Sequence, residues 1–170
     1  MTMIHLHSNE SNSSLDQWTQ EQIQPNAMDL KVDKIFAVKF ENKFSISEDG
    51  KTHRGSVEIK PDNNGWWNLG PGTYEIIMEG EITIGPDEAG WVITRSTLNR
   101  NGVFLTSGLY DSGYKGVMAG AMHIMGNKLT TTAIKKGTRV GQFLLFKAQA
   151  VNQYDGDYGT GKYDEVYKNG

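Results

Sequence analysis

The sequence predicts a single all-β domain. Its 170 residues are enough for one domain with its own core and too few for two comfortable domains. Its 20 glycines stand against 4 prolines without any collagen-like period, which is typical of a chain with many tight turns and bulges. After Pro25, short β-rich runs alternate with turn-forming segments. Strands of this length and spacing favour a sandwich or a barrel.

Two elements are expected before Pro25. Residues 1–14 are polar and of low complexity, so we expect a flexible leader there. The segment SLDQWTQEQI, residues 14–23, predicts a short helix, because Ser14 can cap it and its leucine, tryptophan and isoleucine supply a sparse apolar face.

The strands are expected between turn segments such as SEDGK, PDNNG, EG and NRNG. We expect them at residues 34–40, 43–47, 56–60, 73–78, 81–85, 91–96 and 103–107, with two more at 128–134 and 138–151 around the turn KKG. The tail, residues 153–170, contains too much Gly, Asp and Tyr for a packed element. The chain therefore divides into the leader, a β domain at residues 15–152 and a C-terminal arm that is mobile or ordered by a partner.

Composition and charge exclude several classes of function. The formal net charge of -3 gives no overall basic field, which argues against a protein that grips long nucleic acid. The absence of cysteine removes disulfides, thiolate catalysis and cysteine zinc sites. The apolar runs are far shorter than the roughly 20 residues of a membrane helix, and the opening lacks the apolar core of a signal peptide. We expect a soluble cytoplasmic protein without a membrane partner.

Histidines and one glycine-rich loop are weak candidates for a site. His5 and His7 form an HxH pair, but no further ligand is near them in the sequence, so a plain tail is favoured. His123 lies in an apolar run, where a core or interface histidine is favoured over a ligand or base. Residues 156–162 have Walker A spacing, but a tyrosine follows the lysine and no parallel sheet is predicted, so we reject a P-loop. A glycine-rich arm that closes over a phosphate bound elsewhere remains open.

The segment WVITRSTLNRNG is a better candidate, because two guanidiniums and two hydroxyls within six residues suit a polyphosphate. These side chains belong to Arg95, Ser96, Thr97 and Arg100. The alternative is an ordinary polar strand end. Asp111 follows in SGLYDSGYKG, and residues 112–152 contain no further Asp or Glu. We expect a hairpin to bring Asp111 to the same end of a sheet as the phosphate donors, where it either holds magnesium or activates a water.

Four segments, in order, resemble motifs of the trimeric dUTPase and dCTP deaminase superfamily. They are IQPNAMDLKV, TRSTLNRNG, SGLYDSGYKG and KKGTRVGQFLLF. The matching residues are Ile23, Pro25, Asp29 and Leu30; Arg95, Ser96, Arg100 and Gly102; Gly108, Asp111, Tyr114 and Gly116; and Gly137, Arg139 and Gln142. The resemblance implies a distorted jelly roll of the β-clip, dUTPase-like type, assembled as a homotrimer whose active sites lie between subunits.

The resemblance also implies roles for individual residues. Asp111 would activate the water that attacks the α-phosphorus of dUTP, giving dUMP and pyrophosphate, and Tyr114 would pack on the deoxyribose. Mg²⁺ would bind mainly through the substrate phosphates and water, without a direct protein ligand. The remaining implied contacts are Ser96, Thr97 and Arg100 with the phosphates, Arg95 with the phosphates or the acid network, Gly108 with the base, Gln142 near the phosphate chain, and Asp29 as support.

The tail is similar to both branches of the superfamily. Tyr154, Gly156 and Tyr158 resemble the deaminase ending, and residues 158–161 approximate the fifth dUTPase motif. This resemblance implies that Tyr158 stacks on the base and that the backbone around Thr160 wraps the γ-phosphate. The usual basic residue before the aromatic is missing, and Lys162 would substitute for it.

One position separates the two branches. In dCTP deaminases a glutamate shortly after the third motif shuttles the proton at C4 of cytosine, and here Ala121, or His123 with the alignment shifted by two, takes its place. The acid-free span therefore favours dUTP diphosphatase over dCTP deaminase. Three alternatives stay open: deamination with an unconventional base such as His123, hydrolysis of another pyrimidine triphosphate, and a non-catalytic nucleotide-sensing regulator. Residues 37–68 have no counterpart in the resemblance.

Overall fold

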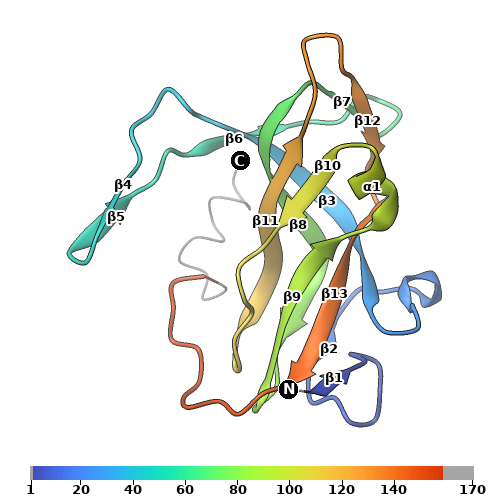
Figure 1. Ribbon diagram of the computed structural model, residues 1–170, viewed down its shortest axis with the longest axis vertical. Coiled ribbons are helices and arrows are strands. Elements are labelled where there is room, and N and C mark those ends of the chain that lie inside the picture. Colours follow the sequence, from blue (N-terminus) through green and yellow to red (C-terminus); the bar gives the residue numbers. More distant parts are fainter. Residues whose placement is uncertain (1, 159–170) are drawn as a thin grey trace.

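The computed structural model describes residues 2–158 (Figure 1). Within them the chain is nearly all β, so the predicted class is confirmed. The elements are β1 (Thr2–Ile4), β2 (Ser14–Leu15), the 3₁₀ helix η1 (Gln20–Gln22), β3 (Met28–Val38), β4 (Ser45–Ser47), β5 (Gly50–Thr52), β6 (Ser56–Ile59), β7 (Trp66–Leu69), β8 (Gly72–Thr83), β9 (Glu88–Thr94), α1 (Ser96–Arg100), β10 (Val103–Thr106), β11 (Lys115–Ile124), β12 (Thr132–Lys135) and β13 (Arg139–Lys147).

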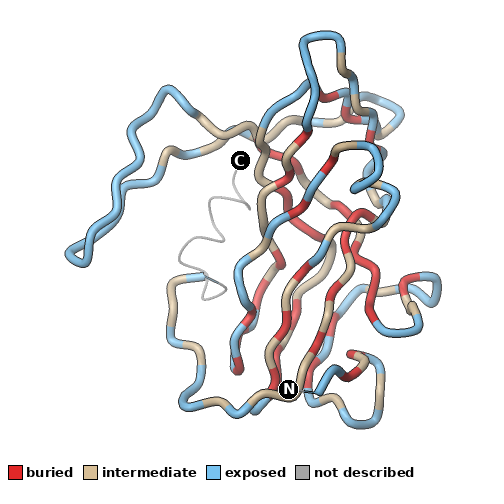
Figure 2. Tube along the Cα trace, in the orientation of Figure 1, coloured by how far each residue is buried: buried red, intermediate tan, exposed pale blue. Residues whose placement is uncertain are grey.

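Nine strands of the described chain form one curled antiparallel sheet. Its main path runs β1-β13-β3-β8-β11-β10, with β9 paired to β13, β2 to β8 and β6 to β3. The curl brings β9 against β10, where the Thr94 hydroxyl accepts from Leu105 N–H at 2.7 Å and donates to its carbonyl at 3.2 Å. The apolar core fills this curl (Figure 2) and includes Leu30, Val32, Ile76, Ile82, Met118, Met122, Phe143 and Leu145.

The strand β11 was not expected from the sequence. KGVMAGAMHI is rich in residues with low β propensity, and its period is obscured by glycine and alanine. Pairing with β8 on one side and β10 on the other makes it a strand, with Met118 and Met122 fully buried. The predicted EG turn is also absent, because β8 continues through Gly80 at φ +81°. A Cβ there would lie 2.5 Å from the Asp16 carbonyl oxygen, so only glycine fits.

The N-terminal segment differs from both expectations for it. Instead of a flexible leader, residues 2–13 contain β1, paired with β13, and the buried side chains of Ile4, Leu6 and Ser13. Instead of a helix from Ser14, β2 pairs with β8, and helical backbone is confined to η1. Pairing with an existing sheet edge outweighs the weak local helix pattern.

Residues 37–68, which the sequence left unplaced, extend the sheet and add a protruding hairpin. β4 and β5 form this hairpin, which projects from the body in Figure 1 and is almost wholly exposed in Figure 2. Lys51 in β5 contacts the C-terminal segment, with its Nζ 3.0 Å from an Asp157 carboxylate oxygen. Of the expected C-terminal arm, residues 153–158 are described, and Tyr154 N–H donates to the Ser112 carbonyl at 2.7 Å.

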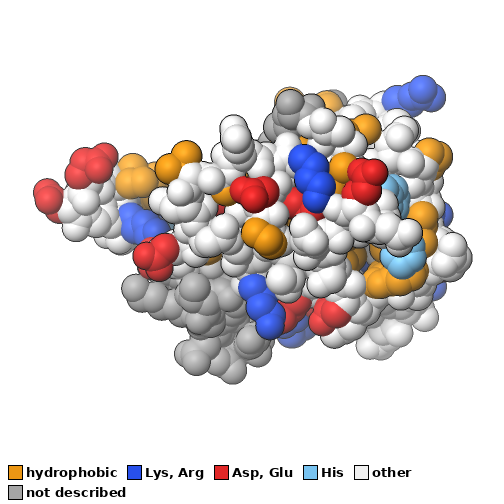
Figure 3. Space-filling view, turned by 90° about the horizontal axis from the view of Figure 1, so that it is seen from below, with side chains coloured by type: hydrophobic (Ala, Val, Ile, Leu, Met, Phe, Trp, Pro, Cys, Tyr) orange, Lys and Arg blue, Asp and Glu red, His pale blue; other side chains and the backbone are white. Residues whose placement is uncertain are grey.

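The surface carries both signs of charge. On the face shown in Figure 3, basic and acidic side chains are interspersed without a continuous basic patch, as the net charge suggests. Among residues 2–158, no helix has the length and apolar character needed to cross a membrane.

Candidate active site

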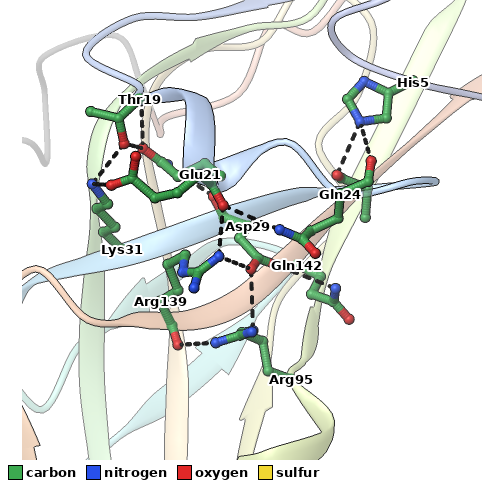
Figure 4. A network of polar contacts seen from close by, with 11 residues as sticks. His5, Thr19, Glu21, Gln24, Asp29, Lys31, Arg95, Arg139 and Gln142 are labelled. Atoms are coloured by element: carbon green, nitrogen blue, oxygen red, sulfur yellow. Dashed lines mark hydrogen bonds and ion pairs between the residues drawn. The ribbon is translucent and has the colours of Figure 1, made fainter.

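Asp29 is the centre of a polar network that joins three of the four motifs (Figure 4). Its side chain is 0% exposed, and its Oδ2 lies 3.3 Å from both Arg95 Nε and Arg139 Nη1. Gln142, opposite Asp29 in the β3–β13 register, donates from Nε2 to Oδ1 at 3.2 Å. A buried carboxylate is tolerated where charged and hydrogen-bonding partners surround it in this way.

Arg95 is held in place by this network before α1 begins. Its Nη1 donates to the Arg139 carbonyl at 3.1 Å, in addition to the Asp29 contact. The three other expected phosphate donors, Ser96, Thr97 and Arg100, follow on α1 and are exposed. The network therefore anchors the start of a short helix that presents hydroxyl and guanidinium groups to the outside.

Gln22 is a buried member of this network that sequence reasoning missed. Its Nε2 donates to the Asp29 carbonyl at 2.9 Å, and its Oε1 accepts from Thr19 N–H at 2.9 Å. The sequence contains a signal for this element, because Thr19 and Gln22 have the spacing of a helix capping box.

The segment from Ser107 to Tyr114 carries Asp111 and is pinned on both sides. Gly90 and Tyr110 exchange backbone hydrogen bonds of 3.0 and 2.8 Å. Ser112 is buried, and its hydroxyl donates to the Glu88 carbonyl at 2.6 Å. Asp111 itself is exposed, so its carboxylate projects from a fixed backbone.

Glu88 ties this hairpin to the N-terminal segment. Its buried carboxylate lies 2.7 Å from Lys147 Nζ and accepts from the Ser13 hydroxyl at 2.5 Å and from Asn12 N–H at 2.9 Å. Burial acts to raise the pKa of Glu88, but the hydrogen bonds from Lys147, Ser13 and Asn12 outweigh it and hold the pKa below its ordinary value.

Two cavities adjoin at Leu109 and Tyr154, which line both of them, and Asp111 lines one of the two. The base-side cavity, about 500 Å³, is lined by Glu75, Gly108, Leu109, Tyr110, Tyr114, Val117, Ala119, Gly120, Ala121, Tyr154 and Tyr158. The acid-side cavity, about 520 Å³, is lined by Ala89, Leu109, Asp111, Ser112 and residues 148–155. The base-side cavity is aromatic and largely apolar, which suits a base and a sugar. The acid-side cavity contains the Asp111 carboxylate in its lining.

Tyrosines form the floor of the base-side cavity. Tyr114 packs edge-on against Tyr110 and Tyr154, with ring centroids 5.1 and 5.3 Å apart. Its hydroxyl donates to the Val117 carbonyl at 2.7 Å. Tyr110 is also buried, which raises the pKa of its phenol, and its hydroxyl donates to the Ala119 carbonyl at 2.9 Å. These bonds fix the rings in one orientation.

The position that separates dCTP deaminases from dUTPases, Ala121 or His123, is at or near the base-side cavity. Ala121 lines it, whereas His123 hydrogen-bonds through Nδ1 with Thr73 at 3.0 Å and through Nε2 with Thr106 at 3.2 Å. A carboxylate nevertheless reaches this place from β8, since Glu75 pairs with Ala121 and lines the cavity. Glu75 lies outside the acid-free span in the sequence, and only the strand register brings it to this place.

Within one chain the phosphate donors and Asp111 are apart, so the expectation that a hairpin brings them to one end of the sheet is wrong. Tyr110, next to Asp111, pairs with Gly90 near the start of β9, while Arg95 follows its end. From Gly90 to Arg95 a strand advances about 16 Å. In Figure 1 α1 lies beside the upper part of the sheet, whereas the chain between β10 and β11 runs down into its lower part.

The expected tail contacts are described in part. Tyr158 is 45% exposed, lines the base-side cavity and donates its N–H to the Tyr154 hydroxyl at 3.0 Å. Thr160 and Lys162 lie outside the described residues, as does most of the Walker-like stretch.

Histidines and carboxylates do not gather into a metal centre in the described part of the chain, which contains no group of three such residues. His5 Nε2 hydrogen-bonds to the carbonyls of Gln24 and Ala27 at 2.8 and 3.0 Å, and His7 packs against Trp18.

Comparisons with known proteins identify the family of this chain. The dCTP deaminase-like family matches residues 2–148. The probable deoxyuridine 5'-triphosphate nucleotidohydrolase of Halobacterium salinarum is 34% identical over 143 residues, which cover 81% of this chain and 83% of that protein. The dUMP-forming dCTP deaminase of Bifidobacterium longum is 28% identical over 160 residues, covering 88% and 79%.

A solved structure extends the comparison to the fold. The 2'-deoxycytidine 5'-triphosphate deaminase from Agrobacterium tumefaciens matches with a TM-score of 0.56 at 14% identity, over 78% of this chain and 43% of that one. This chain thus spans less than half the length of that structure. The likeness confirms the predicted dUTPase-like fold class. By its family match and its fold, the chain belongs to the dCTP deaminase-like family.

Proposed function

We propose that the protein is a magnesium-dependent dUTP diphosphatase that converts dUTP to dUMP and pyrophosphate. The observation that carries this proposal is the place of Asp111, an exposed carboxylate on a pinned hairpin beside an aromatic cavity of about 500 Å³. The name of the Halobacterium relative supports the choice of dUTP.

In the proposed reaction Asp111 accepts a proton from the attacking water while the water oxygen forms a bond to the α-phosphorus. The bond from the α-phosphorus to the bridging oxygen breaks, and pyrophosphate leaves. A magnesium ion carried by the substrate phosphates would supply charge neutralisation. Tyr114, locked by its bond to Val117, offers a rigid ring for the deoxyribose. General base catalysis of this kind contributes about 10²- to 10⁴-fold to a rate.

Because Asp111 and the phosphate donors lie near different ends of β9 in one chain, we infer that a second copy supplies one of the two groups at each site. The resemblance to the trimeric dUTPase and dCTP deaminase superfamily implies that this assembly is a homotrimer, in which Ser96, Thr97 and Arg100 of one subunit contact the phosphates beside Asp111 of another. Gln142 and Asp29 then act through Arg95, by holding the start of α1. Cyclic symmetry of this kind makes the three sites equivalent.

The test is a product screen. The protein is incubated with each dNTP and magnesium, and pyrophosphate and ammonia are measured. Pyrophosphate from dUTP is expected, and no pyrophosphate from any nucleotide would refute the proposal. Asp111→Asn, an isosteric change at an exposed position, should abolish turnover while leaving nucleotide affinity within a few-fold. Retained turnover in this variant would show that another group activates the water.

A further inference from the structure

We infer that Lys51, on the protruding β4–β5 hairpin, is a positioning residue that holds Tyr158 beside the base-side cavity. The hairpin and the described end of the chain, residues 153–158, would then act together on a bound nucleotide. The inference rests on the proposed function in one respect, namely that a nucleotide occupies this cavity. Lys51 belongs to residues 37–68, which have no counterpart in the resemblance to the superfamily, so the contact is a feature of this chain's own insertion.

The ammonium group of Lys51 contacts two consecutive side chains near the end of the described chain. Its Nζ lies 3.0 Å from an Asp157 carboxylate oxygen and 5.3 Å from the centre of the Tyr158 ring. The side chains of Lys51 and Asp157 are 30% and 38% exposed, so water screens this ion pair only in part. A cation at such a distance over a tyrosine ring is attracted to its π face. Lys51 therefore restrains both the Asp157 carboxylate and the Tyr158 ring.

One defined face of the hairpin makes this contact. Ile46 in β4 is directly opposite Lys51 in β5, so their side chains share a face. Ser45 and Thr52, which are also opposite each other, lie on the other face. In Figure 1 the hairpin and the C-terminal segment both lie to the left of the sheet, and the face with Lys51 is the one that contacts Asp157.

The contacts continue from Tyr158 to the residue beside the proposed base. Tyr158 lines the base-side cavity, and its N–H donates to the Tyr154 hydroxyl at 3.0 Å. Tyr154 N–H in turn donates to the carbonyl of Ser112 at 2.7 Å. Ser112 is buried and directly follows Asp111 in the chain. Direct contacts thus join Lys51 to the pinned segment that carries Asp111.

The place of the Tyr158 ring should affect nucleotide affinity. Tyr158 is 45% exposed, so core packing does not by itself fix its ring. If a ligand needs this ring beside the cavity, its apparent affinity falls with the fraction of molecules in which the ring lies elsewhere. Loss of the Lys51 charge increases that fraction. The dissociation constant and KM should therefore rise, while kcat changes little, because the groups at the reacting phosphorus are unaltered.

The test is Lys51→Met, which keeps an unbranched apolar side chain and removes the charge. The dissociation constant of dUTP, measured by calorimetry without magnesium, should rise about threefold to tenfold, as expected for the loss of one cation–π contact and one partly exposed ion pair. KM for dUTP should rise by the same factor. Lys51→Arg can make both contacts and should restore native affinity. Lys43→Met removes a lysine charge from the exposed segment before β4, and this matched control should bind dUTP as the native protein does.

Asp157→Asn tests whether Lys51 acts through its ion pair. In the native background this variant should weaken dUTP binding, and in the Lys51→Met background it should add little, because the partner charge is already absent. An equal loss of affinity in both backgrounds would show that Asp157 acts without Lys51, contrary to the inference.

Hydrogen exchange of the Tyr158 amide tests the positioning role without any nucleotide. This amide is bonded to the Tyr154 hydroxyl, so it should exchange faster in Lys51→Met than in Lys43→Met, and equal rates would overturn the inference. If the amide shows this difference but the protein neither binds nor hydrolyses a dNTP, the proposed function fails and the positioning role stands. If dUTP is hydrolysed and Lys51→Met changes neither the exchange rate nor KM, the positioning role fails alone.

Discussion

Subunit complementation is the sharpest prediction that follows from the separation of Asp111 and α1. Asp111→Asn removes the proposed base, and the double variant Ser96→Ala/Arg100→Ala removes exposed phosphate donors. Each protein alone should be inactive or nearly so, because loss of one charge-stabilising donor already costs about 10²- to 10³-fold. If every site combines Asp111 of one subunit with Ser96 and Arg100 of another, mixed trimers will contain intact sites.

The expected recovery of activity follows from the random assembly of the two variants into trimers. In trimers that assemble at random from equal amounts of the two variants, each half of a site is native in half of the cases. About one quarter of all sites should then be intact, and the mixture should regain about one quarter of native activity. The assay is pyrophosphate release from dUTP by the unfractionated mixture of co-expressed variants. If the mixed trimers are isolated through different tags, each contains one intact site of three and should show about one third of native activity.

No recovery in mixed trimers that are verified by mass spectrometry would refute the reasoning. It would mean that Asp111 and the α1 donors act in one chain, contrary to the roughly 16 Å that separates Gly90 from Arg95 along β9. A monomer in analytical ultracentrifugation, with full activity, would refute it as well.

Two further predictions concern stability. Asp29→Ala leaves the guanidiniums of Arg95 and Arg139 without their buried partner, so urea unfolding should show a loss of about 3–5 kcal/mol, as for other broken buried ion pairs; a loss below 1 kcal/mol would show that the network is not important for stability. Glu88 has a folded pKa below its ordinary value of 4.5, so its stabilising contribution is complete above that pH and is lost as the pH falls through the folded pKa. Glu88→Gln should therefore lower the melting temperature at pH 7 and flatten its fall below pH 4.5, and parallel melting curves across this range would contradict the assigned role.

Local patterns predicted most strands of the sheet but not β11, which pairs with both β8 and β10. β3, β8 and β13 contain β-branched and aromatic runs that indicate strands by themselves. β11 does not, since its residues become a strand through its two neighbours. The N-terminal strands β1 and β2 were not predicted for the same reason. They are short, and they are stabilised by pairing with strands that distant residues form.

The sequence by itself determined the all-β class and the motifs that mark the family, because alternation, turn residues and motif spacing are local properties. It also singled out Asp111, Tyr114 and the residues around Arg95 as site candidates. Only the tertiary structure decided which of them meet: it joined Asp29 to Arg95, Arg139 and Gln142, and it separated Arg95 from Asp111. It also placed Glu75 opposite Ala121, where the sequence had shown no acid. The physical reason is that strand register is set by side-chain packing between segments far apart in the chain, which no local pattern encodes.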